Sequence, residues 1–269
     1  MPYGAKKGLY DDAASMRKRE GDDKKMRIEQ PVFVDSPIEL NKPFEDLNFS
    51  DCIWNGSRGG TLLVLEGIDG SGKTTLAYQI ARALSGFLNE HVLLTAEPTI
   101  NLKGGLAILT KKHAIKHPMD RRFEAIQLSM DHAIHLAKIV IPALSAGMIV
   151  ICDRWFWSSY CYQVERLEEV GDPEPLEFLR ELHKGWDVIP DATFYLKLPV
   201  NIAMSRIQSR ADELHDYEKE EFLARVAKRY DKLCCLHDFI LLDGEKSTEE
   251  LLYEAMEICI NRITANRRD

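Results

Sequence analysis

The sequence predicts an α/β protein built on a five-stranded parallel sheet with helices on both faces. Two observations carry this prediction: short apolar segments recur along the chain, and longer helical patterns separate them. The five apolar segments span residues 61–66, 91–95, 148–152, 192–198 and 239–242. Strands that alternate with helices are typical of a parallel sheet that is covered on both faces.

Length and composition allow one large domain and a tail. The chain has 269 residues, and 45% of them are hydrophobic, which is enough for a substantial core. We expect residues 60–269 to form the α/β domain and residues 1–59 to form an N-terminal extension. Residues 1–27 mix acidic and basic side chains without an apolar segment, so we expect this part of the extension to be disordered.

The strand at 61–66 leads into a glycine-rich loop. Gly67, Gly72, Lys73 and Thr74 have the spacing of a P-loop, in which backbone N–H groups turn inward around phosphate oxygens. Apolar residues at helical spacing follow, so the N-terminus of a helix would face the same phosphates. The alternative is a solvated glycine turn before an ordinary helix, which the flanking strand and helix disfavour.

Polar residues follow the second and third strands. Glu97 comes just after the second strand, and Asp153 and Arg154 come directly after the third. Ligands of parallel sheets bind at the carboxyl ends of the strands, where these residues and the glycine-rich loop meet. Asp153 is suited to hold Mg²⁺ together with the Thr74 hydroxyl, although it could instead cap the next helix. Arg154 offers two parallel donors for a second phosphate, with a surface ion pair as the alternative.

The clearest helix is predicted at 122–145. Its apolar residues at helical spacing, all on one face, are Ile126, Met130, Ile134, Ala137 and Ile141. Between the fourth and fifth strands, residues 206–230 are rich in charged side chains, which is also the pattern of a solvated helical face.

Several classes of protein are disfavoured. A net charge of −8 gives no support for nucleic acid as the main partner. No apolar run approaches the roughly 20 residues that span a bilayer, so we expect no membrane association. Six cysteines show neither disulfide-type pairing nor zinc spacing, so we expect a reduced, cytoplasmic protein.

Four stretches, taken in order, resemble the thymidylate kinases, which belong to the P-loop nucleoside monophosphate kinases. The stretches are 66–75, Glu97-Pro98, 153–163 and 206–230, and the resemblance covers roughly residues 60–265. It implies a P-loop kinase fold with a short lid, and Mg²⁺-dependent transfer of the ATP γ-phosphoryl group to a deoxynucleoside monophosphate, most often dTMP. It also implies a homodimer formed through helices that include 122–145.

The resemblance assigns roles to individual residues. Lys73 would bridge the β- and γ-phosphates, Arg154 would hold the acceptor phosphate, and Asp69 would orient phosphates or Mg²⁺. The implied ATP-binding residues are Gly67, Ile68, Asp69, Gly70, Ser71, Gly72, Lys73, Thr74 and Thr75. The implied metal ligands are Thr74, Asp153 and Glu218. The implied acceptor-binding residues are Glu97, Leu128, His132, Arg154, Ser159, Tyr162 and Gln163.

The lid would supply the catalytic arginine. Family members that have glycine at the position of Gly70 carry this arginine in the lid, which makes Arg206 and Arg210 the candidates. Arg210 is nearer to the expected tip of the lid. The alternative for both is a solvated helix residue.

Three departures from the family pattern lie where the acceptor would be recognised. Ala96 replaces an arginine, Leu128 replaces the phenylalanine that stacks on thymine, and His132 replaces a second arginine. Trp155, Trp157 or Phe123 could supply another stacking face, and the alternative for either tryptophan is a place in the core. These departures leave two other functions open: a P-loop kinase with a different small acceptor, and a catalytically silent nucleotide-binding regulator.

Overall fold

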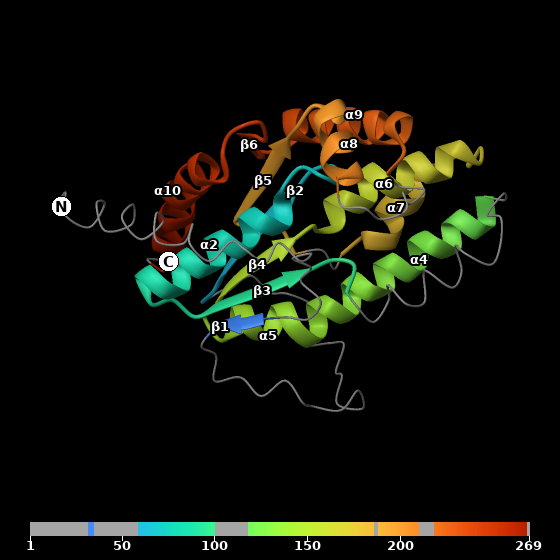
Figure 1. Cartoon of the computed structure of the whole chain (residues 1–269). Coiled ribbons are helices and arrows are strands. Elements are labelled where there is room, and N and C mark those ends of the chain that lie inside the picture. The colour runs from blue at the N-terminus through green and yellow to red at the C-terminus, as the bar shows by residue number, and fades with distance from the viewer. Residues whose placement is uncertain (1–31, 35–58, 100–117, 186–187, 210–217, 268–269) are drawn as a thin grey trace.

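The computed structural model describes residues 32–34, 59–99, 118–185, 188–209 and 218–267. A six-stranded sheet with the strand order β1-β3-β4-β2-β5-β6 forms the centre of the fold (Figure 1). The strands are β1 (Val32–Val34), β2 (Thr61–Glu66), β3 (Val92–Ala96), β4 (Ile149–Asp153), β5 (Ala192–Lys197) and β6 (Ile240–Asp243). The five strands expected from the sequence are all present, are parallel to one another, and begin and end within one residue of their predicted bounds.

A sixth strand, which the sequence did not predict, adds to the five parallel strands. Strand β1 comes from the N-terminal extension and pairs antiparallel with β3, with Val32 opposite Leu94. A three-residue strand that follows Pro31 is too short for an alternating pattern to reveal it in the sequence. The remainder of the extension except Gly59, like the lid segment at 210–217, lies outside the described residues.

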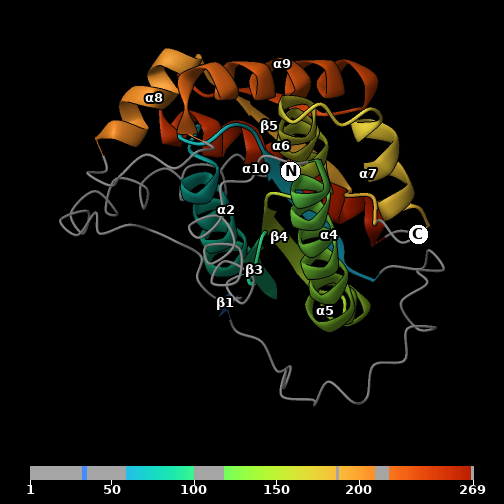
Figure 2. The same ribbon diagram turned by 90° about the vertical axis from the view of Figure 1, so that its right-hand side faces the viewer.

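Helices cover both faces of the sheet (Figure 2). One face carries α2 (Lys73–Leu88) and α10 (Thr248–Asn266), whose apolar residues share a buried cluster with Leu63, Leu65 and Ile151. The other face carries α4 (Pro118–His135), which continues through the π-helical turn Leu136–Val140 into α5 (Ile141–Ser145). Every residue of β2 and β4 is buried, as two-sided coverage of central strands requires.

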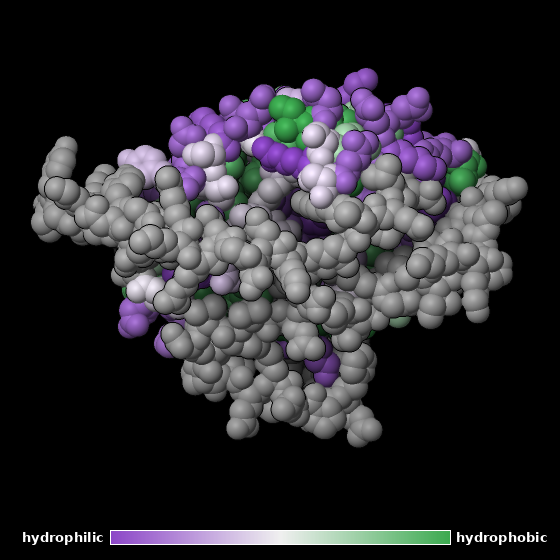
Figure 3. Space-filling model, viewed as in Figure 1, coloured by the Kyte–Doolittle hydropathy of each residue, from purple (hydrophilic) through white to green (hydrophobic). Residues whose placement is uncertain are grey.

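Four more helices complete the layer beside α4 and above the ends of the strands. They are α6 (Phe156–Glu169), α7 (Pro175–His183), α8 (Val200–Gln208) and α9 (Glu220–Leu236). Helix α9 packs on the fold through Phe222, Val226 and Tyr230, and the surface over α8 and α9 is largely hydrophilic in the view of Figure 3. The charged residues of the predicted lid region therefore include a solvated helical face from residue 218 onward, as the sequence suggested.

Helix α4 shows how burial differs from the apolar pattern of the sequence. The stripe that includes Ile126 and Met130 is not the buried face: 58% of the Met130 surface is exposed. The face that turns toward the sheet carries polar side chains, among them His132 and His135, which are 3% and 1% exposed. Hydrophobic periodicity assumes an apolar core, and this helix instead covers the polar ends of β3 and β4.

Candidate functional site

The glycine-rich loop is held in a shape that needs glycine. Gly67, Gly70 and Gly72 have φ values of 142°, 81° and 100°, in the region that side chains disfavour. A Cβ atom at Gly67 or Gly70 would lie 2.7 Å from a backbone oxygen, that of Leu196 or Ala203 respectively. The loop therefore packs directly on the end of β5 and on α8, and the glycines make that approach possible.

Helix α2 begins directly after the loop, at Lys73. Gly72 is its N-cap, no side chain in the described structure caps it, and no acidic residue stands in its first turn. The first backbone N–H groups of a helix have no partners within the helix, and they carry its partial positive charge. This end of α2 is thus suited to bind an anion, as the sequence predicts.

Lys73 points back over the loop. Its Nζ atom donates to the backbone oxygen of Ile68 at 2.7 Å and lies 3.4 Å from the Ser71 hydroxyl. Burial, with a further contribution from the charge of Arg154, lowers the pKa of Lys73 to about 8. A lysine held this way places a positive charge inside the curve of the loop.

Thr74 and Asp153 lie together where α2 meets β4. The Thr74 hydroxyl donates to Oδ2 of Asp153 at 2.5 Å. The other carboxylate oxygen, Oδ1, is buried and has no hydrogen-bond partner among the described residues. A hydroxyl beside an unsatisfied carboxylate oxygen fits the preference of Mg²⁺ for oxygen ligands. Glu218 lies just before α9, and its assignment to the same metal stays a prediction.

Arg154 connects the ends of β2 and β4. Its backbone φ is 74°, unusual for a residue with a side chain. Its guanidinium donates to the backbone oxygen of Gly67 at 3.1 Å, to Asp69 Oδ1 at 2.5 Å and to the Tyr162 hydroxyl at 3.2 Å. Burial would raise the pKa of Asp69, but the charges of Arg154 and Lys73 outweigh it and hold that pKa below its ordinary value.

Glu66, the last residue of β2, is a residue of the site to which the sequence predictions gave no role. Its Oε1 accepts from the backbone N–H groups of Trp155 and Ser158, at 2.9 and 3.2 Å. Its Oε2 accepts from the hydroxyls of Ser158 and Tyr230, at 2.8 and 2.7 Å. Arg154 donates to the same two hydroxyls, at 3.2 and 3.5 Å. Glu66 therefore accepts hydrogen bonds from the same two hydroxyls that Arg154 contacts, and so fixes their positions.

The chemical environment of Glu66 is unusual. Full burial raises its pKa to about 7, although Arg154 and three hydrogen bonds, from Tyr230, Ser158 and Trp155, act in the opposite direction. The signal that could have revealed it was a carboxylate at the end of an otherwise apolar, buried strand.

The predicted lid arginines differ in what the structure describes. Arg206, on α8, donates to the backbone oxygens of Gly70 and Ser71, each at 3.5 Å, and to that of Gly244 at 3.1 Å. It is therefore attached to the glycine-rich loop and is not simply a solvated helix residue. Arg210 lies outside the described residues.

Four of the seven predicted acceptor residues lie in two groups. Tyr162 joins the Arg154 and Asp69 contacts, and its hydroxyl donates to Asp69 Oδ2 at 3.0 Å. Glu97 and His132 lie together at the end of β3 and on α4. The remaining three, Leu128 on α4 with Ser159 and Gln163 on α6, stay predictions.

Glu97 is held by two histidines. His132 and His135 each donate from Nδ1 to its Oε1, at 2.7 and 2.8 Å. Burial would raise the pKa of Glu97, but His132 and the two hydrogen bonds lower it to about 2. Trp155 is buried beside His132, with ring centroids 4.7 Å apart, and its Nε1 donates to Val188. This tryptophan is therefore a core residue, which is the second of the two roles considered for it from the sequence.

Comparisons with known proteins agree with the motifs. A family model described as thymidylate kinase matches residues 65–255. A "Probable thymidylate kinase" of Methanosarcina acetivorans is 39% identical over 194 residues, which are 71% of this chain and 91% of the relative. A second, of Methanosarcina barkeri, is 34% identical over 211 residues, which are 77% of this chain and 99% of the relative. Among the described residues, no helix is long and apolar enough to cross a membrane.

Proposed function

The chain belongs to the thymidylate kinase family, and on that premise we propose that it transfers the γ-phosphoryl group of ATP to dTMP, giving dTDP and ADP. Neither a different acceptor nor a silent regulator is favoured by the family and its named members. The observation that carries the assignment to this site is the meeting of Lys73 and Arg154 around Asp69, beside the N-terminus of α2. Two groups of positive charge at one edge of the sheet suit two phosphorylated substrates.

The donor half of the reaction belongs to the glycine-rich loop. Backbone N–H groups of the loop and of α2 bind the ATP phosphates, and Lys73 exchanges its bond to Ile68 for β- and γ-phosphate oxygens. Thr74 and Asp153 would hold Mg²⁺, which neutralises phosphate charge when bound. Arg206 fixes the position of the loop relative to α8 through its hydrogen bonds to the loop carbonyls.

The acceptor half belongs to Arg154 and its surroundings. Its planar group has two parallel donors, which match a phosphate, and Asp69 and Tyr162 fix its direction. We assign Arg154 to the phosphate of dTMP, and Glu97, Leu128, His132, Ser159, Tyr162 and Gln163 to the remainder of the acceptor pocket. Because phosphoryl transfer requires little covalent chemistry from the protein, positioning and charge account for most of the work of these residues.

A coupled ADP-release assay tests this function. The protein is supplied with Mg·ATP and with a panel of nucleoside monophosphates and nucleosides, and a reaction without acceptor controls for ATP hydrolysis. We expect the highest kcat/KM with dTMP. No turnover with any acceptor, in protein that still binds ATP, would refute the proposal.

Arg154→Ala then tests the acceptor assignment. The loss of a charge-assisted bond of about 1.5–3 kcal/mol should raise the KM for dTMP roughly 10- to 150-fold. Arg180→Ala is the matched control, because Arg180 is exposed on α7 and pairs only loosely with Glu177, at 3.9 Å. An unchanged KM in Arg154→Ala would remove Arg154 from the acceptor site.

Two further parts of the proposal concern assembly and location. The outward face of α4 presents large apolar side chains, and those of Met119, Phe123 and Met130 are 62%, 52% and 58% exposed. We propose that this face forms a homodimer, because an apolar stripe on one helix gains by being covered. We also propose that the protein is cytoplasmic, because its six cysteines lack disulfide-type spacing.

Light scattering coupled to size exclusion tests the dimer. Met130→Glu should convert a dimer into a monomer, because it would place a charge in the contact. Leu236→Glu, at the exposed end of α9, is the control and should leave the mass unchanged. A wild-type protein with the mass of a monomer at all concentrations would contradict this part of the proposal.

A further inference from the structure

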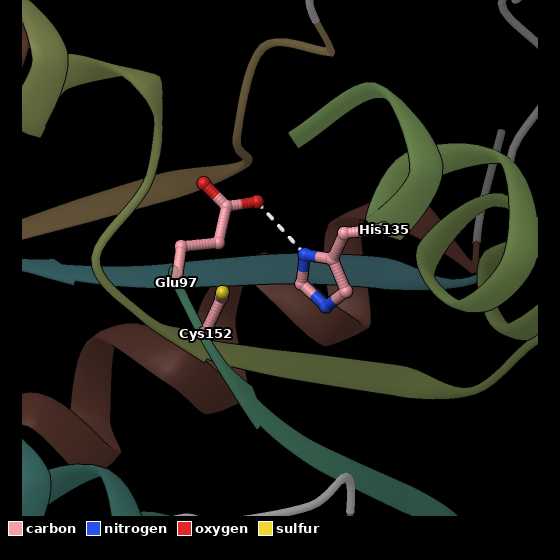
Figure 4. Close-up of side chains that lie close together, drawn as sticks. All are labelled: Glu97, His135 and Cys152. Carbon is pink, nitrogen blue, oxygen red and sulfur yellow. Dashed lines mark hydrogen bonds and ion pairs between the residues drawn. The ribbon is translucent and has the colours of Figure 1, made fainter. Parts of the chain in front are cut away.

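Three different metal-binding side chains meet beneath α4, on the opposite face of the sheet from α2. One ligand atom each of Glu97, His135 and Cys152 lies within 4.8 Å of the other two. Glu97 follows β3, His135 is on α4 and Cys152 is on β4, and their side chains converge in Figure 4. The sequence gives no hint of this cluster, because its members are far apart in the chain.

The register of the sheet explains why they meet. Thr95 of β3 lies opposite Cys152 of β4, so both side chains project from the same face. Cys152 belongs to the buried cluster that contains Leu136 and Val140, which places it under the helix that carries His135. The next residue, Asp153, points to the other face and contacts Thr74. The cluster is therefore distinct from the site suited to Mg²⁺.

The surrounding contacts orient the cluster. The second ring nitrogen of His135, Nε2, is hydrogen-bonded to the Thr95 hydroxyl at 2.8 Å. Histidines that bind metals usually have their other nitrogen fixed in this manner. His132 brings another nitrogen, Nδ1, to the same Glu97 oxygen that His135 contacts. The side chain of Glu97 is 10% exposed, whereas the rest of the cluster is closed to solvent.

We propose that Glu97, His135 and Cys152 form a binding site for a zinc-like divalent cation. Zn²⁺ takes carboxylate, imidazole and thiolate ligands in a tetrahedron with bonds of about 2.0–2.3 Å. Such bonds separate the ligand atoms by roughly 3.3–3.6 Å. Because the three ligand atoms lie within 4.8 Å of one another, no pair has to approach by more than about 1.5 Å. Thiolate and imidazole ligands exclude Mg²⁺ and Ca²⁺, which prefer oxygen alone.

Binding requires a defined exchange of protons. Nδ1 of His135 gives up its hydrogen bond to Glu97 and directs its lone pair to the metal. The ring proton then resides on Nε2 and is donated to the Thr95 hydroxyl oxygen, so the imidazole stays neutral. Cys152 binds as thiolate and releases its proton to solvent, so this thiol contributes one proton per metal bound.

The hydrogen-bonded cluster has an alternative explanation without a metal. Two histidines that fix Glu97 account for those three residues, and Cys152 would then be only a small apolar residue of the core. The two explanations differ in what they require of the sulfur. A metal site needs the Cys152 thiolate as a ligand, whereas the hydrogen-bonded network does not involve it.

Cobalt spectroscopy on the full chain decides between them. Co²⁺ stands in for Zn²⁺ and gives a thiolate-to-metal charge-transfer band only when it binds sulfur. Nucleotide is omitted, so the outcome does not depend on the proposed kinase function. All of these titrations use a background protein in which Cys52, Cys234 and Cys235 are replaced with serine. Cys235 is exposed, Cys234 is its neighbour, and Cys52 lies outside the described residues.

We expect one equivalent of Co²⁺ to give the band and Zn²⁺ to displace it. Cys152→Ala should abolish the band and weaken Zn²⁺ binding by more than 100-fold, measured by calorimetry. Cys259→Ala removes an equally buried thiol between α10 and the sheet and should change neither quantity. If Cys152→Ala fails to fold by circular dichroism, His135→Gln replaces it, with the same loss of Zn²⁺ affinity expected.

Two results would overturn the proposal: no charge-transfer band in the background protein, or Zn²⁺ binding of full strength in a folded Cys152→Ala or His135→Gln variant. If the band appears as expected, Zn²⁺ should also raise the KM for dTMP, because the metal would fix Glu97. That last effect rests on the proposed function, so a normal KM together with a clear band would count against the acceptor role of Glu97 and not against the metal site.

Discussion

Replacing Glu66 with glutamine should remove a large pH dependence from the stability of the fold. The pKa of this buried carboxyl is about 7, above its ordinary value of 4.5. Between these pH values the folded protein keeps a proton that the unfolded chain has released. The stability associated with neutral Glu66 is therefore fully present below about pH 4.5 and is lost as the pH rises to about 7.

The size of the effect follows from the shift in pKa. A difference of roughly 2.5 pH units, from 4.5 to about 7, corresponds to about 3 kcal/mol of unfolding free energy. Because the side chain is completely buried, solvent screening does not reduce this value substantially. For a protein of this size, such a change corresponds to roughly 6–12 °C in Tm. Glutamine has the same shape and does not titrate, so it should lack this change altogether.

Urea unfolding followed by circular dichroism, at pH values from 5 to 8, provides the measurement. We expect the stability of Glu66→Gln, relative to the wild type, to rise by about 2.5 kcal/mol from pH 5 to pH 8. Glu165→Gln is the control, because it removes another buried carboxylate, one that is paired with Arg225 and Arg229. A constant difference between Glu66→Gln and wild type across this range would refute the reasoning.

Three substitutions test the donor site. Lys73→Ala should lower kcat by about 100- to 1,000-fold in protein with wild-type circular dichroism, because it removes one buried charge from the phosphates; full activity would contradict its role. Gly70→Ala should destabilise the fold by about 1–3 kcal/mol in thermal unfolding, since its φ is 81° and its Cβ would meet the Ala203 oxygen at 2.7 Å. Asp153→Asn should raise the Mg²⁺ concentration for half-maximal activity about 10-fold, whereas Asp243→Asn, on the exposed end of β6, should not.

The strands and the glycine-rich loop could be predicted from local sequence alone. Buried parallel strands are continuous apolar segments, and their bounds follow from composition. The loop spacing is specific because three glycines must occupy backbone conformations that other residues disfavour. Strand β1 lacked both kinds of signal, since three residues give no periodicity and its pairing with β3 is decided by the tertiary structure.

The polar face of α4 could not be predicted in this way. His135 becomes a buried residue only because α4 crosses the ends of β3 and β4, where Glu97 and Thr95 are available as partners. The apolar stripe of the same helix points outward, so periodicity identified the helix correctly but not the side that packs on the sheet. Sequence spacing reports local geometry, whereas these contacts depend on which strands are neighbours.

The pairing of β2 with β4 links the two halves of the site. These strands are adjacent although one follows the other by more than eighty residues, and their register places Leu65 opposite Asp153. Glu66 consequently lies beside Arg154, one residue beyond the pair, and the loop of β2 begins where Arg154 binds Gly67. Any shift of this register would separate the buried carboxylate from the arginine and the arginine from the loop. The same pairing that fixes the centre of the sheet therefore sets the spacing between the donor and acceptor charges.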